Sequence, residues 1–227
     1  MAHVRRDERG STSHSILTRR KRGALDSPHV RAPHGRAWVR AMSTTPLKRG
    51  ATYDDLCAVP DRFIAEILDG ELYASPRLAI PHAHAASVLS AELGGAFDRG
   101  CDGPGGWVFL NKPEVHFGND VLVPDIAGWR RARLPRVPAA AFTTLAPDWI
   151  CEVLSASTET LDRGKKLRIY AREGVAHAWL LDPLRQTLEV LSLESGRWAQ
   201  LDAHEGRVSV RAAPFDAIEL ELGALWI

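Results

Sequence analysis

Two short apolar runs, separated by a segment long enough for a helix, constrain the fold of this chain most strongly. Residues 149–154 read WICEVL and residues 176–181 read AHAWLL. Runs of this length and composition are typical of strands that are buried on both faces. Residues 157–173 between them predict a helix, and Gly174 follows as a glycine commonly does after a helix end. The sequence therefore predicts a buried strand, a helix and a second buried strand, in this order.

The residues before this unit predict two more helices and a set of strands. Thr52 is a suitable N-cap for a short helix that Pro60 stops, and Asp69-Gly70 is a strong hairpin signal. Pro124 falls inside one strand segment and marks an edge position or a bulge. The predicted helices are 53–59 and 82–97, the predicted strands are 63–68, 71–74, 107–110, 114–117 and 121–129, and a basic, Pro-rich loop is expected at 130–146.

The last part of the chain predicts a C-terminal antiparallel meander. Residues 187–193, 198–201 and 208–211 have strand character, and turn residues separate them. Strands and helices in this order indicate an α/β (α+β) fold with a mixed β-sheet flanked by helices. A length of 227 residues allows one such domain, which we expect at 42–227.

Residues 1–41 differ from the rest of the chain in charge. They contain ten Lys and Arg against three acidic residues, a net charge of +7, which leaves −6 on residues 42–227. Their lack of apolar periodicity predicts a disordered basic tail. Two interpretations stay open: an arm that binds nucleic acid, or an artefact of start-site choice, because Met42 offers a second start.

Several classes of protein lack their signatures in this sequence. No apolar stretch approaches the roughly 18 residues of a membrane helix, so no membrane partner is expected. The three cysteines are not spaced as a zinc ribbon or a disulfide scaffold, which favours reduced thiols in a cytoplasmic protein. The five histidines of residues 42–227 lack the spacing of zinc ligands, and the sequence contains neither a phosphate-binding loop nor a G-x-S-x-G motif.

Three carboxylates stand inside apolar segments, where a charge is costly. They are Glu66 in FIAEIL, Asp125 in VLVPDIAGW and Glu152 in WICEVL. A buried carboxylate without a partner is strongly unfavourable, so each one needs compensation. A shared hard cation such as Mg²⁺ would supply it, because Mg²⁺ takes carboxylate oxygens as ligands and keeps waters for phosphates. An ion pair with Lys or Arg would supply it equally well, and the pattern leaves both open.

Two lysines and a histidine are candidates to act beside these carboxylates. Lys165 and Lys166 lie early in the predicted helix 157–173, and Lys166 shares a helix face with Tyr170. A lysine there could reach the strand end and stabilise an attacking hydroxide or the charge on a phosphate. The alternative is a pair of lysines on a solvated face. His82, at the start of a predicted helix, is either catalytic or part of the polar surface.

Three segments of this sequence resemble the Uma-two family of restriction endonucleases, which belongs to the PD-(D/E)XK nuclease superfamily. The segments are FIAEILDGELYASP, VLVPDIAGWRR and APDWICEVLSASTETLDRGKKLRIYAREGVAHAWLLDP, and the resemblance runs from about Tyr53 to about Leu222. It implies a restriction-endonuclease-like core at 42–227. It also implies an Mg²⁺-dependent endodeoxyribonuclease, with Mn²⁺ as an alternative metal, that hydrolyses phosphodiester bonds of DNA or another nucleic acid.

The resemblance also assigns roles to individual residues. Asp125 matches the aspartate of the PD motif and Glu152 matches the second acid, so both would be catalytic and would bind the metal. Leu154 stands where the superfamily has its lysine, and Lys166 matches a displaced lysine on the following helix. Glu66 matches a third metal-binding acid. His82 and Tyr170 match supporting positions around the site.

An acidic body leaves an alternative function open. Affinity for DNA comes largely from Lys and Arg, and we expect the basic stretches 129–133 and 163–172 to form a rim beside the site. The alternative is a catalytically inactive interaction module with the nuclease fold, which could form a homodimer through its terminal strands. Convergence of Glu66, Asp125 and Glu152 with Lys166 in one cleft would favour the enzyme, and their dispersal would favour the module.

Overall fold

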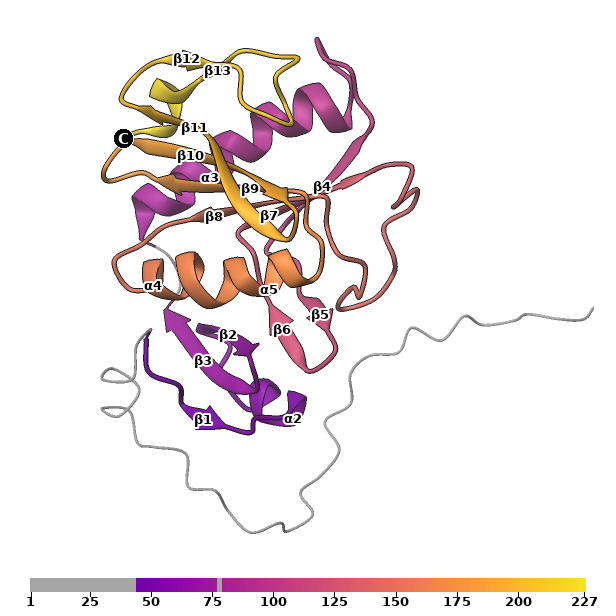
Figure 1. The fold of residues 1–227 in the computed structure, drawn as a ribbon, viewed down its shortest axis with the longest axis vertical. Helices are drawn as coiled ribbons and strands as arrows, with labels where there is room; N and C mark the ends of the chain where they lie inside the picture. The colour runs from indigo at the N-terminus through magenta and orange to yellow at the C-terminus, as the bar shows by residue number, and fades with distance from the viewer. Residues whose placement is uncertain (1–43, 77–78) are drawn as a thin grey trace, which may run out of the picture. The chain divides into compact units, whose positions relative to one another are not determined.

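A computed structural model describes residues 44–76 and 79–227 of the chain (Figure 1). The basic tail predicted at 1–41 lies outside these residues. The first sheet of the domain has five strands in the order β1-β3-β2-β6-β5, and all of its strand pairs are antiparallel. Its strands are β1 (Lys48–Arg49), β2 (Phe63–Leu68), β3 (Glu71–Pro76), β5 (Val115–Phe117) and β6 (Asp120–Leu122).

The second sheet is mixed and has six strands in the order β11-β10-β9-β8-β7-β4. Strands β8 and β9 are parallel, and the other neighbours are antiparallel. The strands are β4 (Trp107–Asn111), β7 (Ile126–Arg130), β8 (Trp149–Val153), β9 (His177–Asp182), β10 (Thr187–Glu194) and β11 (Arg197–Glu205). The predicted mixed sheet is confirmed, and so is the order of a buried strand, a helix and a second buried strand along the chain.

The helices lie close to where the sequence predicts them. Thr52 caps the first helix in a capping box with Asp55, and the next helix continues into a π-helical turn at the two glycines Gly94 and Gly95. The predicted helix 157–173 is one helical segment with a π-helical turn in its middle. The helical elements are α2 (Tyr53–Cys57), α3 (Ile80–Leu93), η1 (Gly94–Asp98), α4 (Glu159–Leu161), η2 (Asp162–Lys166), α5 (Leu167–Arg172) and η3 (Leu222–Leu225).

The alternation of side chains along the central strand β8 explains how the helices are placed. Trp149, Cys151 and Val153 pack on one face of the sheet in the cluster that contains α3, while Ile150 packs on the other face with α5. Figure 1 shows the six-stranded sheet between these helices. Because side chains point to alternate faces along a strand, Glu152 points to the same face as Ile150, toward α5. Its carboxylate lies beneath the helical segment 159–172.

Two sequence predictions about strands are wrong. Residues 121–129 do not form one strand: β6 and β7 belong to different sheets, because Pro124 cannot donate a ladder hydrogen bond and breaks the pairing. Residues 208–211 do not complete the meander either. There β12 (Ser209–Val210) pairs with β13 (Leu220–Glu221), and this pairing buries Val210 and Leu220 against the α3 cluster.

Within the described part of the chain, no helix has the length and apolar character needed to cross a membrane.

Candidate active site

Asp125 lies at the break between β6 and β7, and both of its carboxylate oxygens accept hydrogen bonds. Oδ2 accepts from the backbone N–H of Val153 at 2.8 Å and faces Nε2 of His82 at 3.1 Å. Oδ1 accepts from Nζ of Lys112 at 2.6 Å. Residues 121–129 do not form one continuous strand, and the irregular turn at Pro124 aims Asp125 out of the sheet, toward a pocket.

Lys112 follows directly after β4 and is held in an unusual backbone conformation. Its φ angle is +50°, in the left-handed region that L-residues other than Gly, Asn and Asp seldom adopt. Its backbone N–H donates to the carbonyl oxygen of Asp125 at 3.0 Å, so the two residues are joined through backbone and side chain. The side chain is 36% exposed, which leaves part of this cation open to solvent.

Lys166 is the centre of a buried acidic cluster. Its Nζ atom lies 2.9 Å from both carboxylate oxygens of Glu152 and 3.1 Å from Oε1 of Glu66. Asp162, one helical turn earlier, approaches it at 3.5 Å. The Lys166 side chain is only 4% exposed. The predicted convergence of Lys166 and Tyr170 on one helix face is confirmed, because Tyr170 donates to Oε1 of Glu152 at 2.7 Å.

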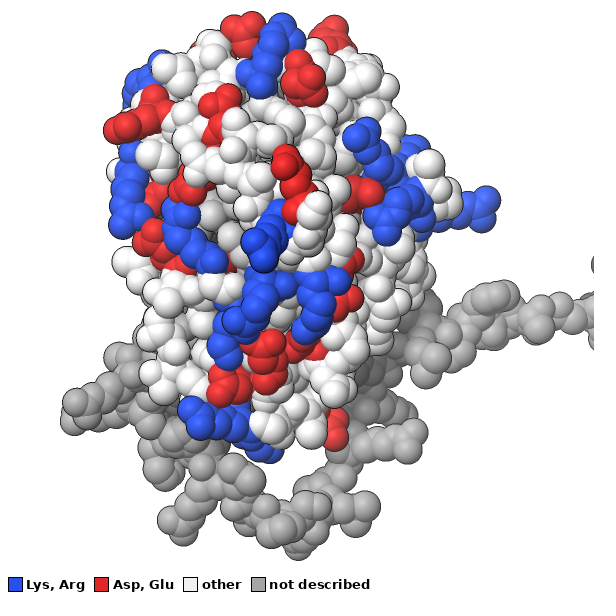
Figure 2. Space-filling view, in the orientation of Figure 1, with Lys and Arg blue, Asp and Glu red and all other residues white. Residues whose placement is uncertain are grey.

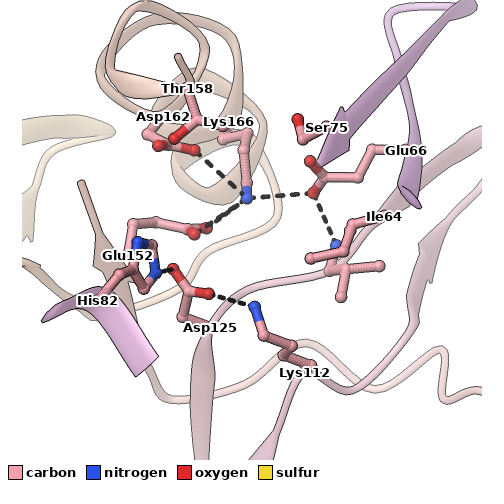
Figure 3. A pocket seen from close by; sticks show the side chains of 11 residues that line it. Ile64, Glu66, Ser75, His82, Lys112, Asp125, Glu152, Thr158, Asp162 and Lys166 are labelled. Carbon is pink, nitrogen blue, oxygen red and sulfur yellow. Dashed lines mark hydrogen bonds and ion pairs between the residues drawn. The ribbon is translucent and has the colours of Figure 1, made fainter. Parts of the chain in front are cut away.

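These side chains share one pocket (Figure 3). The sheet with β2 supplies Glu66, which also accepts from the backbone N–H of Val123 at 2.8 Å. The other sheet supplies Glu152, and the helical segment supplies Lys166. The pocket is about 320 Å³ and partly open to solvent. It is lined by Ile64, Glu66, Ser75, His82, Lys112, Val123, Asp125, Glu152, Thr158, Asp162 and Lys166.

The electrostatic environment divides the carboxyl groups into two kinds. Burial opposes ionisation of Asp125, but the hydrogen bond from His82 and the nearby charges outweigh it and hold the Asp125 pKa well below its usual range. Burial raises the pKa of Glu152 well above its usual range, since Asp162, Asp125 and Glu66 add repulsion that Lys166 offsets only in part. Burial also raises the pKa of Asp162 to about 6. The pocket therefore has more acid than its cations neutralise.

Lys166 keeps its charge in this environment. Burial disfavours the ammonium form, but Glu152, Glu66 and Asp162 outweigh that cost and raise the pKa of Lys166 well above its usual range. Burial and the neighbouring Glu152 likewise raise the pKa of Tyr170, so its hydroxyl stays a hydrogen-bond donor. The structure thus contains the ion pair that the sequence left as one of two explanations for the buried acids.

The chemistry of the pocket suits a divalent cation as well. Carboxylate oxygens are the ligands that Mg²⁺ prefers, and one or two of them suffice when waters complete the shell. Burial, together with the neighbouring acids, raises the pKa values of Glu152 and Asp162, and a dication beside them would favour their ionised forms. The buried Nδ1 of His82 also lacks a hydrogen-bond partner among the described residues. As the side chains stand, however, the described residues hold no group of three or more His, Cys, Asp or Glu positioned as metal ligands.

The basic rim expected beside the site is largely neutralised by ion pairs. In the stretch 163–172, Arg163 pairs with Glu159 and Glu189, and Arg168 pairs with Asp69. Figure 2 shows Lys and Arg side chains interspersed with Asp and Glu on the face it presents. Phosphate contacts by these arginines would compete with their ion pairs, whereas Lys112 lines the pocket and is partly exposed.

Lys112 and Asp162 are the two charged residues of the pocket lining that the sequence prediction missed. Lys112 stands in a segment with no repeating pattern, and only its contacts with Asp125 reveal it. Asp162 had a signal, since it precedes Lys166 by one helical turn. The predicted residues Glu66, His82, Asp125, Glu152, Lys166 and Tyr170 all lie in or against the pocket. Their functional roles stay predictions.

The fold and the pocket together define an α+β domain with a buried, acid-rich pocket. The crystal structure of a "putative nuclease belonging to DUF820" from Anabaena variabilis matches with a TM-score of 0.62 and 22% sequence identity. The match covers 78% of this chain and 97% of that one, and at this identity it establishes the fold alone.

Family membership comes from the sequence itself. The profile of the Uma2 family, described as "Putative restriction endonuclease", matches residues 51–223. This chain belongs to the Uma2 family. A search of curated proteins found no match.

Proposed function

We propose that this protein is a metal-dependent endonuclease that hydrolyses phosphodiester bonds of DNA, with Mg²⁺ as the metal and Mn²⁺ as an alternative. One observation carries the proposal: Glu66, Asp125 and Glu152 converge with Lys166 in one solvent-accessible pocket, although they come from separate elements. This convergence favours an enzyme over the inactive interaction module. The family description is in keeping with the nuclease, and the three free cysteines are in keeping with a cytoplasmic location, which we propose as well.

Each residue has a role that its surroundings suggest. Asp125 and Glu152, with Glu66 beside them, would hold the metal, whose chemistry is to polarise a phosphate and acidify a bound water. Lys166 is too deeply buried to meet a phosphate directly, so it serves as a positioning residue that keeps Glu66 and Glu152 in place. Tyr170 and His82 fix Glu152 and Asp125 by hydrogen bonds.

Lys112 is the cation that would contact the substrate. It lines the pocket, its side chain is partly exposed, and its contact with Asp125 places it next to the proposed metal ligand. An ammonium group in this position offsets charge that develops on a phosphate during hydrolysis. The two lysines therefore have different proposed roles. Lys112, which follows β4, contacts the substrate, and Lys166, on the helical segment, positions the carboxylates.

Cleavage of plasmid and single-stranded DNA by the full chain, with Mg²⁺, Mn²⁺ or EDTA, tests the function. We expect activity that requires metal and falls at least about 100-fold in Asp125→Asn, because metal catalysis contributes several kcal/mol to the barrier. Asp120→Asn is the matched control. Asp120 is also buried, but it binds Asp69 and Arg172 outside the pocket. Full activity in Asp125→Asn, or no metal-dependent cleavage by the wild type, would refute the proposal.

A further inference from the structure

A second hollow is lined by residues that neighbour Lys112 in the chain, and its lining differs from that of the proposed active site. It is about 510 Å³, partly open to solvent, and its walls come from the end of β4 with the residues that follow, and from the loop at 137–143. Most of the lining is apolar, with Leu110, Val137 and Phe142 among it, and the carboxylate of Glu114 is its charged group. A mostly apolar lining with a few polar groups that fix orientation is the usual form of a ligand site.

Phe142 forms the aromatic wall of this hollow. Its ring is 40% exposed. His116 stacks against it with ring centroids 3.9 Å apart and an interplanar angle of 10°, and Tyr53 meets His116 edge-on at 5.0 Å. One face of Phe142 is therefore covered by an aromatic layer, and the residue remains partly exposed in the lining of the hollow.

The wall is fixed before any ligand arrives. Oε1 of Glu114 accepts from the Tyr53 hydroxyl and faces Nε2 of His116, each at 2.7 Å. The backbone of the loop is tied to β5, because His116 N–H donates to the Thr143 carbonyl at 2.9 Å and Thr143 N–H donates to the Glu114 carbonyl at 3.0 Å. A ligand that stacks here would not have to order the wall, so little affinity is lost.

Consecutive residues of the chain line this hollow and the proposed active site. Lys112 lines the catalytic pocket, while its neighbours Asn111 and Pro113 line the second hollow. A phosphate held at Lys112 would bring an adjoining nucleotide toward the residues that line this hollow. The carboxylate of Glu114 can accept a hydrogen bond from an exocyclic amino group of a base.

We propose that the hollow at Phe142 binds an unpaired nucleobase next to the phosphate that is cleaved. The proposal rests on the proposed nuclease function and narrows its substrate class: the nucleic acid offers an unstacked base, in a single strand or flipped out of a duplex. Because consecutive residues of the segment 111–113 line this hollow and the phosphate pocket, a nucleobase is favoured over an apolar peptide side chain. Phe142 supplies the stacking surface and Glu114 the hydrogen-bond acceptor.

Binding of the full chain to DNA in EDTA tests this without cleavage. The probes are a fluorescein-labelled single-stranded oligonucleotide and the same sequence as a duplex. We expect the single strand to bind more tightly, and Phe142→Leu to lose roughly 5- to 100-fold of that affinity, since Leu keeps apolar bulk but cannot stack. Leu184→Ala, which removes an exposed apolar side chain outside the hollow, is the control and should bind as the wild type does.

The outcomes separate the base site from the nuclease function. If the wild type binds and cleaves DNA but Phe142→Leu retains full single-strand affinity, the base site is refuted and the nuclease proposal stands. If Phe142→Leu loses affinity with an unchanged melting temperature, stacking is supported over a structural role. If the wild type neither binds nor cleaves any DNA, both proposals fail together.

Discussion

Lys112 and Asp125 are joined twice, through a backbone hydrogen bond of 3.0 Å and a side-chain contact of 2.6 Å. The first bond helps to hold Lys112 in a left-handed conformation, and the second aims its ammonium group at the pocket. Strained backbone of this kind costs about 1 to 3 kcal/mol, and it persists only where the surrounding structure determines it. The strain and the contact together support the role that we propose for Lys112.

Replacing Lys112 by Asn should separate its charge from its backbone role. Asn tolerates the left-handed region, so the fold should keep its stability while the cation is lost. If Lys112 contacts a phosphate, the plot of log affinity for DNA against log salt concentration, measured in EDTA, should become shallower by about 1. Lys48→Asn, at an exposed lysine outside the pocket, should leave the slope unchanged. Equal slopes for Lys112→Asn and the wild type would remove Lys112 from the interface.

Lys166→Met should destabilise the protein strongly. The change leaves Glu152, Glu66 and Asp162 buried without their shared cation, and breaking a buried ion pair in this way costs about 3 to 5 kcal/mol. Urea unfolding measures the loss. Lys165→Met is a matched control, because Lys165 is partly exposed and pairs with Glu71 at the surface, so its loss should cost at most about 1 kcal/mol. Similar losses in the two variants would contradict the buried cluster.

Asp162 should make stability depend on pH near neutrality. Its pKa is about 6 in the folded protein against an ordinary value of 3.8, so the folded state binds more protons between these values. Stability contributed by the protonated group is thus present at low pH and is lost as the pH rises through about 6. Asp162→Asn should be more stable than the wild type above pH 7, by roughly 2 to 3 kcal/mol, and similar to it near pH 4.

Urea unfolding in EDTA at pH 4.5 and 7.5 checks the effect of Asp162. Asp216→Asn, at an exposed aspartate, should follow the wild-type profile at both pH values. If Asp162→Asn keeps the wild-type difference between the two pH values, the Asp162 carboxyl is not the group that titrates.

The sequence identified the acids of the site because a carboxylate within an apolar run is anomalous on its own. Glu152 in WICEVL shows this most clearly, since every neighbour on β8 is buried. Lys112 gave no such signal, because its left-handed backbone and its contacts with Asp125 exist only in the tertiary structure. The break at Pro124 was visible as a proline in a strand, but the assignment of β6 and β7 to two sheets depends on partners distant in sequence.

Binding of the metal should be visible as stabilisation of the folded chain. A ligand that binds only the folded state adds about 2.7 kcal/mol at 100 times its Kd, which for a domain of this size raises the Tm by roughly 5 to 10 °C. We expect this shift with Mg²⁺ or Mn²⁺ in the wild type and in Asp120→Asn, whose buried carboxylate lies outside the pocket. Asp125→Asn should lose the shift, because a neutral amide is a poorer ligand for a hard dication than a carboxylate. An equal shift in Asp125→Asn would place the metal elsewhere on the protein and would require another assignment for the acids of the pocket.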